Sequence, residues 1–157
     1  MKNKKIYISR DEALSKLQRY CVYQDRCHKE VRTKLLDIGI YGDTLEEIIS
    51  ELIQENFLNE ERFACSYARG KFRMKKWGKS KILQGLKYRN ISDYCIRKAM
   101  EEIEVLDYEE TLNQLIEKKW EQSKETDVFK KRNKIAKYLA QRGYEYSLIW
   151  PALKKLT

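Results

Sequence analysis

FLNEERFACSYARGKFRMKKWGKSKILQGLKYRNI, the sequence of residues 57–91, decides the fold. Asn59 is followed by two glutamates, which is the pattern of a helix start with a capping side chain and acids in the first turn. A Trp–Gly pair then interrupts the helical spacing, and Asn90 is suited to end a second helix in the left-handed conformation. The stretch therefore predicts two consecutive helices, over 59–76 and 79–89.

The same stretch carries an unusual concentration of positive charge. From Arg62 to Ser92 there are ten Lys and Arg residues and no acidic residue. Aromatic side chains, among them Tyr67, Trp77 and Tyr88, alternate with these cations. A basic surface with aromatic rings suits phosphate backbones and stacked bases, and it also suits an acidic groove of a protein. We expect the partner of this chain to bind here.

Composition favours an all-helical protein of one-domain size. The chain has 157 residues, only six Gly and one Pro, and a formal net charge of +9. Residues 1–56 carry ten basic and ten acidic groups, residues 57–104 carry twelve and six, and residues 105–157 carry eleven and eight. The middle third therefore contributes +6 of the total charge, which marks it as the basic part of the molecule.

Apolar residues outside the central stretch recur at helical spacing, and they predict seven further helices. Four of them have both limits predicted: Ser9 to Gln24, Cys27 to Gly39, Asp43 or Thr44 to Asn56, and Asp107 to Trp120. One helix is expected to begin at Ser92 or Asp93, and another is expected to end at Gly143. The last helix is expected to begin at Ser147, with Pro151 near its first turn.

The apolar pattern repeats with a period near 50 residues. Val31, Ile82 and Ile135 correspond, at separations of 51 and 53, and a Gly or Asn follows eight residues after each of them. We therefore predict an all-α protein of three tandem three-helix repeats. The repeats are expected to stack as an elongated right-handed array, which can be curved. The expected parts are a basic arm (1–8), repeat 1 (9–56), a basic repeat 2 (57–105) and repeat 3 (106–157).

The helix over 59–76 is expected to separate core and cationic residues on two faces. Arg62, Arg69, Arg73 and Lys76 share one stripe. Phe63, Tyr67, Gly70 and Met74 share the neighbouring stripe, which is assigned to the core, and Gly70 is expected to permit close approach of another helix. The candidate residues for binding DNA or a protein partner are Arg62, Arg69, Arg73, Lys75, Lys76, Lys79, Lys81, Lys87, Tyr88, Lys130, Lys134 and Lys137. The alternative is that these are ordinary solvated helix faces.

Nothing in the sequence forms a catalytic pattern. No phosphate-binding loop, dinucleotide fingerprint or HExxH motif is present, and His28 is the single histidine. The spacing of Cys21, Cys27, Cys65 and Cys95 fits no zinc finger or ribbon, so buried apolar thiols are favoured over a Cys/Cys/His zinc site. We expect a protein that is not an enzyme and that needs no cofactor or metal.

No apolar run approaches the length of about 18–20 residues that spans a bilayer, and the apolar piece near the basic N-terminus is too short for a signal peptide. A cytoplasmic protein with no membrane contact is expected.

The central stretch resembles the signature of the RecX regulatory proteins. The resemblance rests on residues 57–64 (FLNEERFA), Tyr67, Trp77-Gly78 and Ile82, and on a flanking pattern in the first repeat that includes residues 30–32 (EVR) and Gly39. It extends over essentially the full length and weakens in the last third.

This resemblance implies an all-helical modulator of the recombinase RecA. Members of the family lie in the groove of the RecA filament on single-stranded DNA, block filament growth or promote disassembly, and lower RecA output in recombination, DNA repair and the SOS response. The partners so implied are the RecA filament and the backbone of single- or double-stranded DNA, and the chain is expected to act as a monomer. The alternative is a stand-alone helical DNA-binding protein with no RecA-specific role.

Overall fold

The computed structural model describes residues 8–156, in which the chain forms nine α-helices and no strand. The helices are α1 (Arg10–Tyr23), α2 (His28–Asp37), α3 (Gly42–Gln54), α4 (Glu60–Lys75), α5 (Lys79–Tyr88), α6 (Asp93–Glu101), α7 (Val105–Gln122), α8 (Val128–Gln141) and α9 (Tyr146–Lys154). The predicted all-helical fold is confirmed. The expected basic arm, residues 1–8, lies outside the described residues except for Ile8.

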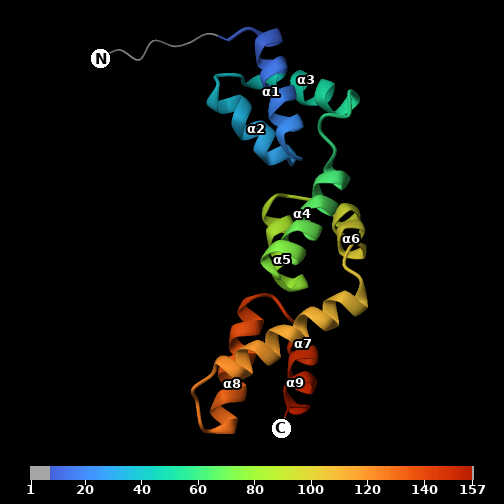
Figure 1. Cartoon of the computed structure of the whole chain (residues 1–157). Helices are drawn as coiled ribbons and strands as arrows, with labels where there is room; N and C mark the ends of the chain where they lie inside the picture. Colours follow the sequence, from blue (N-terminus) through green and yellow to red (C-terminus); the bar gives the residue numbers. More distant parts are fainter. Residues whose placement is uncertain (1–7, 157) are drawn as a thin grey trace, which may run out of the picture.

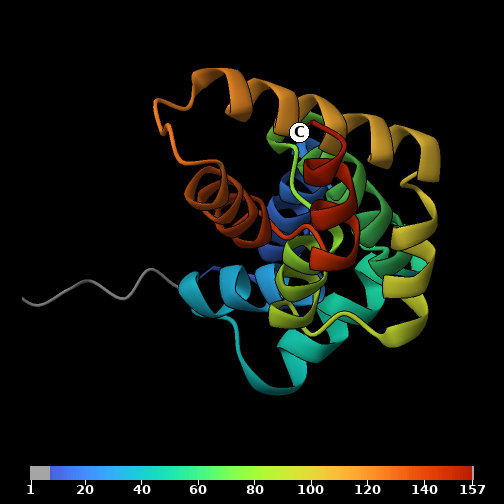
Figure 2. The same cartoon turned by 90° about the horizontal axis from the view of Figure 1, so that it is seen from below.

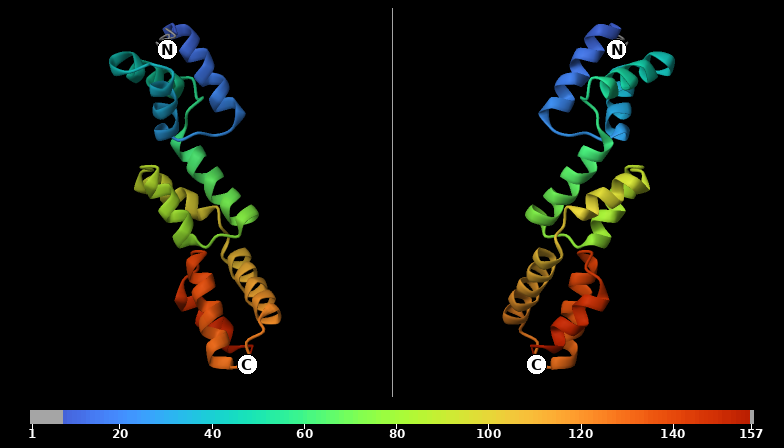
Figure 3. Two further views of the ribbon diagram at one scale, coloured as in Figure 1. Left: turned by 90° about the vertical axis from the view of Figure 1, so that its left-hand side faces the viewer. Right: turned by 90° about the vertical axis from the view of Figure 1, so that its right-hand side faces the viewer.

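The helices group in threes along one direction, so the molecule is elongated (Figure 1). We call α1–α3 unit 1, α4–α6 unit 2 and α7–α9 unit 3. Two side views show the units end to end, with unit 1 at one end of the molecule and unit 3 at the other (Figure 3). Along the long direction the units lie over one another (Figure 2). The array of helical repeats is thus confirmed, while the division at 9–56, 57–105 and 106–157 into separate domains stays a prediction.

The predicted repeat is visible in the backbone hydrogen bonds that end the second helix of each unit. Gly39, Asn90 and Gly143 have positive φ angles of 88°, 57° and 101°. In each unit the next residue donates its N–H to a carbonyl five residues back, from Ile40 to Leu35, Ile91 to Leu86 and Tyr144 to Leu139, at 2.9–3.2 Å. This is the Schellman pattern, in which a left-handed residue lets the chain turn and satisfy a terminal carbonyl.

Capping side chains start three of the helices as expected. The Ser9 hydroxyl accepts the Glu12 N–H at 3.2 Å, the Asn59 amide oxygen accepts the Arg62 N–H at 2.9 Å, and the Ser92 hydroxyl accepts the Cys95 N–H at 3.3 Å. Each bond satisfies an N–H that has no partner within its own helix. These caps fix where α1, α4 and α6 begin.

Three helices begin earlier than the sequence predicts. The helices α3, α7 and α9 start at Gly42, Val105 and Tyr146, ahead of the polar residues that were expected to cap them, and none of the three has a side-chain cap. Pro151 is therefore the sixth residue of α9 and not in its first turn. Its missing N–H leaves the Ser147 carbonyl without a helical partner, but both residues are exposed, so water can satisfy that carbonyl.

Apolar contacts divide the molecule into two cores of different extent. Unit 1 has a core of its own, formed by residues such as Leu17, Leu35, Ile48 and Leu52. Units 2 and 3 share one continuous core between Phe63 and Leu153, and Cys27 of unit 1 packs into it. Since burial of apolar area is the main stabilising contribution, this shared core holds units 2 and 3 together.

The joint between units 2 and 3 is made largely by backbone atoms. The N–H of Gly78 donates to the Arg142 carbonyl at 2.8 Å, and the N–H of Ser80 donates to the Gly143 carbonyl at 3.0 Å. A β-carbon on Gly78 would overlap the peptide of Gly143 and Tyr144. The close approach therefore requires glycine, and it brings the turn between α4 and α5 against the end of α8.

A buried tyrosine completes this joint. Tyr108 of α7 is 2% exposed and lies between Phe72 and Tyr144, with ring centroids 5.9 Å and 5.2 Å away. Its hydroxyl donates to a Glu145 carboxylate oxygen at 2.8 Å and accepts the Lys79 N–H at 3.0 Å. Tyr108 thus satisfies the first N–H of α5 while it packs units 2 and 3 together.

The core face of α4 differs from the predicted stripe. Phe63, Ala64, Ala68 and Phe72 are buried, whereas Met74 is 84% exposed. Apart from its chain neighbours and the backbone of α4, no atom lies within 4 Å of where a β-carbon on Gly70 would be, so Gly70 does not admit a neighbouring helix. The assignment of Met74 and Gly70 to the core is wrong, because α6 packs on the face with the small alanines, where backbones approach most closely.

Candidate nucleic-acid interface

The twelve candidate residues lie on α4, α5, α8 and the turn between α4 and α5, and the structure separates them into groups with different surroundings. The sequence interpretation treated the cations of residues 62–92 as unopposed, because no acid occurs among them. In space, acids from other elements face several of them. The premise of an unopposed cluster is therefore wrong for part of the set.

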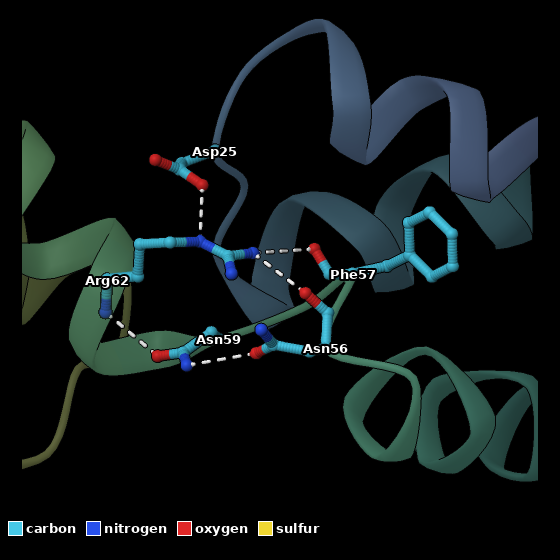
Figure 4. A network of polar contacts seen from close by, with 5 residues as sticks. All are labelled: Asp25, Asn56, Phe57, Asn59 and Arg62. Atoms are coloured by element: carbon cyan, nitrogen blue, oxygen red, sulfur yellow. Dashed lines mark hydrogen bonds and ion pairs between the residues drawn. The ribbon is translucent and has the colours of Figure 1, made fainter.

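Arg62 is engaged at the joint between units 1 and 2 (Figure 4). Its guanidinium donates to an Asp25 carboxylate oxygen at 2.8 Å and to the carbonyl oxygens of Asn56 and Phe57, each at 3.1 Å. These three contacts use the guanidinium to hold the linker between α3 and α4 against the loop after α1. The structure thus gives Arg62 a role in joining two units, and a role in binding stays a prediction.

Replacement of Arg62 by Met is expected to lower the free energy of unfolding by about 1 kcal/mol. The variant keeps most of the aliphatic stem but loses the charged hydrogen bonds, whose value is reduced because the side chain is 38% exposed. Chemical unfolding followed by circular dichroism measures the change. The matched control is Arg97→Met, because Arg97 is an exposed arginine of α6, and this control is expected to stay within about 0.5 kcal/mol of the wild type. An equal effect of both variants would contradict the structural role of Arg62.

Two further cations of α4 and its C-cap residue lie near acids at the end of α6 and on α7. Arg69 forms an ion pair with Glu102 at 3.1 Å. Arg73 and Lys76 line a groove together with Asp107 and Glu110. These acids follow the acid-free stretch in sequence but fold back beside it, so the potential over this face of α4 is partly cancelled.

The cations on α5, α8 and the end of α4 are more open. Among residues 8–156, no ion pair within 4 Å is formed by Lys75, Lys87, Lys130 or Lys137, and all four side chains are exposed. Lys134 differs, because it pairs with Glu125 at 2.9 Å, and this contact lowers the pKa of the Glu125 carboxyl. The four exposed lysines form the part of the predicted set best suited to attract a polyanion.

Several aromatic rings have a cation over one face, and the sequence interpretation named none of these pairs. Lys81 and Lys71 lie 4.5 Å and 4.9 Å from the ring of Trp77, and Lys79 lies 4.8 Å from the ring of Tyr108. In unit 3, Lys131 lies 4.0 Å from Trp120. Trp77 and Lys81 are only four residues apart, so a pattern in the sequence could have suggested this pair. Trp120 and Lys131 lie on different helices, so no local pattern predicts their contact.

Tyr88 is the aromatic residue of the predicted set, and it is exposed. It is 70% exposed at the end of α5, and Lys29 of unit 1 lies 3.9 Å from its ring centroid. The lysine also donates to the Tyr88 carbonyl at 3.0 Å. Because 59 residues separate the two, no local spacing predicts this pair.

The cysteines have the surroundings of packing residues. All four are free thiols, three of them buried and Cys65 half-buried. Burial raises the pKa of each thiol, to about 11 for Cys27, so they are protonated at neutral pH and are poor nucleophiles. Within residues 8–156, no three His, Cys, Asp or Glu side chains are grouped so that they could hold a metal ion. In the same range no helix combines the length and the apolar character that crossing a bilayer requires.

Stacked three-helix units of this kind define an α-helical repeat protein. Two family models identify the family of this repeat protein. The model described as "RecX, second three-helix domain" matches residues 59–100, and the model described as "RecX, third three-helix domain" matches residues 107–153. Together they cover more than half of the chain, and the chain belongs to the RecX family.

Relatives of known sequence and structure agree with this assignment. The Regulatory protein RecX of Clostridium perfringens (strain 13 / Type A) is 31% identical over 134 residues, which cover 84% of this chain and 62% of that protein. That of Bacillus mycoides is 25% identical over 137 residues, which cover 87% and 51%. The chain thus spans about three fifths or less of these curated relatives. The crystal structure of RecX from Lactobacillus salivarius superposes with a TM-score of 0.84 at 27% identity, over 94% of this chain and 96% of that one.

Proposed function

We propose that this chain is a regulator that binds the RecA filament on single-stranded DNA and restrains the growth and activity of the filament in recombination and DNA repair. Membership of the RecX family carries the proposal, since relatives bear the name Regulatory protein RecX and the family resemblance implies RecA as the target. In this proposal the chain acts by binding and not by catalysis.

The shape and the charge of the molecule support a binding role along an extended polyanion. The three units lie end to end, so that exposed side chains on successive units can contact successive parts of one filament. Lys75 and Lys87 of unit 2 and Lys130 and Lys137 of unit 3 are exposed. Lysines of this kind neutralise phosphates without reading sequence, which suits a regulator that must act on filaments over any DNA.

The direct test is the ATPase activity of RecA on single-stranded DNA, with and without this chain. Addition of the chain at amounts stoichiometric with RecA is expected to lower the steady rate of ATP hydrolysis. Addition of the chain after the filament has assembled distinguishes disassembly of the filament from a block of its growth. Unchanged ATPase and strand exchange under both orders of addition would refute the proposed function.

Reversal of three exposed lysines tests the interface. The variant Lys87→Glu/Lys130→Glu/Lys137→Glu is expected to bind single-stranded DNA about tenfold more weakly at low salt, with a slope of log K against log salt shallower by about 2. Fluorescence anisotropy with a labelled oligonucleotide measures both quantities. The control Lys16→Glu/Arg19→Glu/Lys155→Glu changes the net charge equally at exposed positions of units 1 and 3. If both variants lose the same affinity, the effect is one of net charge and the assigned interface is wrong.

A stand-alone DNA-binding protein is the second candidate function, and the same exposed lysines favour it. It predicts salt-sensitive DNA binding in the absence of RecA and no effect on RecA beyond competition for DNA. The triple reversal separates the two functions. A variant that no longer binds DNA but still inhibits RecA would rule out the stand-alone function, because competition for DNA could not explain the remaining inhibition.

A further inference from the structure

A cavity lies where unit 1 meets unit 2, between α2 and the C-terminal end of α5. It has a volume of about 270 Å³, and its lining includes Tyr20, Lys29 and Lys34 of unit 1 and Tyr88 and Arg89 of unit 2. Pockets for drug-sized ligands typically have about 300–1,000 Å³. The size therefore suits one small planar group.

Cations and rings are arranged around this cavity. The Lys29 ammonium lies 3.9 Å from the Tyr88 ring centroid, the Arg89 guanidinium lies 6.0 Å from the same centroid, and Lys34 lies 5.6 Å from the ring of Tyr20. Three cationic side chains thus meet at the cavity, and the aromatic surface comes from both units. A ligand that offers acceptor oxygens and a flat ring satisfies both features.

The acids at the cavity do not cancel these cations. Glu30 is engaged within unit 1, because its carboxylate accepts the Cys27 N–H at 3.3 Å and lies 3.7 Å from the Arg26 guanidinium. Asp37 is the second acid in the lining, and it is exposed. Three cations therefore face one engaged and one exposed carboxylate, and the cavity keeps a positive potential.

The internal contacts of Lys29 and Arg89 leave donors available. Lys29 donates once, to the Tyr88 carbonyl at 3.0 Å, and Arg89 donates once, to the Gly85 carbonyl at 3.0 Å. An ammonium has three donors and a guanidinium has five. Both cations can therefore cap α5 and contact a phosphate at the same time.

We propose that this cavity binds one unstacked base of a single-stranded nucleic acid, with the base displacing the Lys29 ammonium from the ring of Tyr88, and with the neighbouring phosphates on Lys29, Lys34 and Arg89. The inference rests on the proposed function only in taking a nucleic acid as the ligand. A base in a duplex is paired and stacked on its neighbours, so it cannot enter such a site without an energetic cost. The site therefore gives the chain a preference for single strands, which the exposed lysines alone do not provide.

The test is the variant Tyr88→Ala, assayed by anisotropy with a labelled oligothymidylate and with a duplex of equal length, both without RecA. Affinity for the single strand is expected to fall about 5- to 20-fold, as the loss of one base stack predicts, while affinity for the duplex changes less than about twofold. Tyr88→Phe keeps the ring and is expected to bind like the wild type. The ring is 70% exposed, so folding is expected to be unaffected, and a thermal melt of each variant checks this.

Two controls make the test specific. Tyr94→Ala removes another exposed tyrosine, 52% exposed on α6 with Lys98 at 5.7 Å from its ring but outside the cavity, and it is expected to bind like the wild type. An oligonucleotide of abasic sites is expected to bind the wild type and Tyr88→Ala equally, because it has phosphates but no bases.

Several outcomes would overturn the inference: no binding of the single strand by the wild type at low salt, equal loss on single strand and duplex, or a loss for Tyr94→Ala as large as for Tyr88→Ala. Failure of the proposed function is a separate result. If the wild type inhibits the RecA ATPase while Tyr88→Ala binds DNA normally, the base site alone is wrong. If Tyr88 matters for single strands but RecA is unaffected, the proposed function alone is wrong.

Discussion

The variant Gly143→Ala is expected to lower the free energy of unfolding by about 2–4 kcal/mol. Gly143 has a φ of 101°, and its β-carbon would lie 2.6 Å from the Lys81 amide nitrogen and 2.8 Å from the Gly78 carbonyl oxygen. The substitution combines backbone strain, which costs about 1–3 kcal/mol, with a forced separation of α5 from the end of α8. Denaturant unfolding followed by circular dichroism measures the loss.

Gly70→Ala is the matched control for this prediction, because it makes the same chemical change in the middle of α4, where no neighbouring atom lies within 4 Å. It is expected to raise the free energy of unfolding by about 0.5–1 kcal/mol, since alanine favours a helix over glycine. A Gly143→Ala protein as stable as the wild type would show that the joint between units 2 and 3 tolerates displacement, against the packing described above.

Truncation of Tyr108 to alanine is expected to destabilise the protein by about 3–5 kcal/mol. The change removes a ring that is 2% exposed between Phe72 and Tyr144, leaves a cavity, and deprives the Lys79 N–H and the Glu145 carboxylate of their partner. Tyr108→Phe separates the two contributions, because it keeps the ring and is expected to lose only about 1–2 kcal/mol. Thermal unfolding of the two variants gives both numbers, and equal losses would contradict the contribution of the buried ring.

The Tyr108→Phe variant also differs from the wild type in how its stability depends on pH. Burial raises the pKa of Tyr108, and it raises the pKa of Tyr144 to about 12, whereas an unfolded tyrosine titrates near 10. The unfolded chain therefore releases protons first, so this contribution to stability is fully present below about pH 10 and is lost as the pH rises through the folded values. Tyr108→Phe removes one of the two groups, and its stability is expected to fall less steeply above pH 10 than that of the wild type.

Sequence reasoning was sufficient for the order of the helices, since the period of apolar residues and a few capping side chains determine it locally. Ser9, Asn59 and Ser92 cap as their positions predict, and Gly39, Asn90 and Gly143 all adopt the left-handed conformation. Where a helix starts without a side-chain cap, as α7 does at Val105, no local signal marks the boundary.

The candidate interface was less predictable, because the field around a charge depends on neighbours that are distant in sequence. The stretch from Arg62 to Ser92 is free of acids, yet Asp25 meets Arg62 and Glu102 meets Arg69. The role of Tyr108 was missed for the same reason, since its partners Phe72 and Tyr144 are 36 residues away on either side. Helical spacing placed Met74 on a core stripe, but the choice of face depends on where α6 packs.

The joint between units 2 and 3 also bears on how the sequence can change over evolutionary time. Main-chain amides and carbonyls at Gly78, Ser80, Arg142 and Gly143 set the angle at which the two units meet, and these atoms are common to every residue type. As long as the two glycines and the ring of Tyr108 are retained, the surrounding surface residues can be substituted without a change in that angle. Substitutions on the outer faces of α5 and α8 are therefore expected to accumulate while the angle between the two units stays the same.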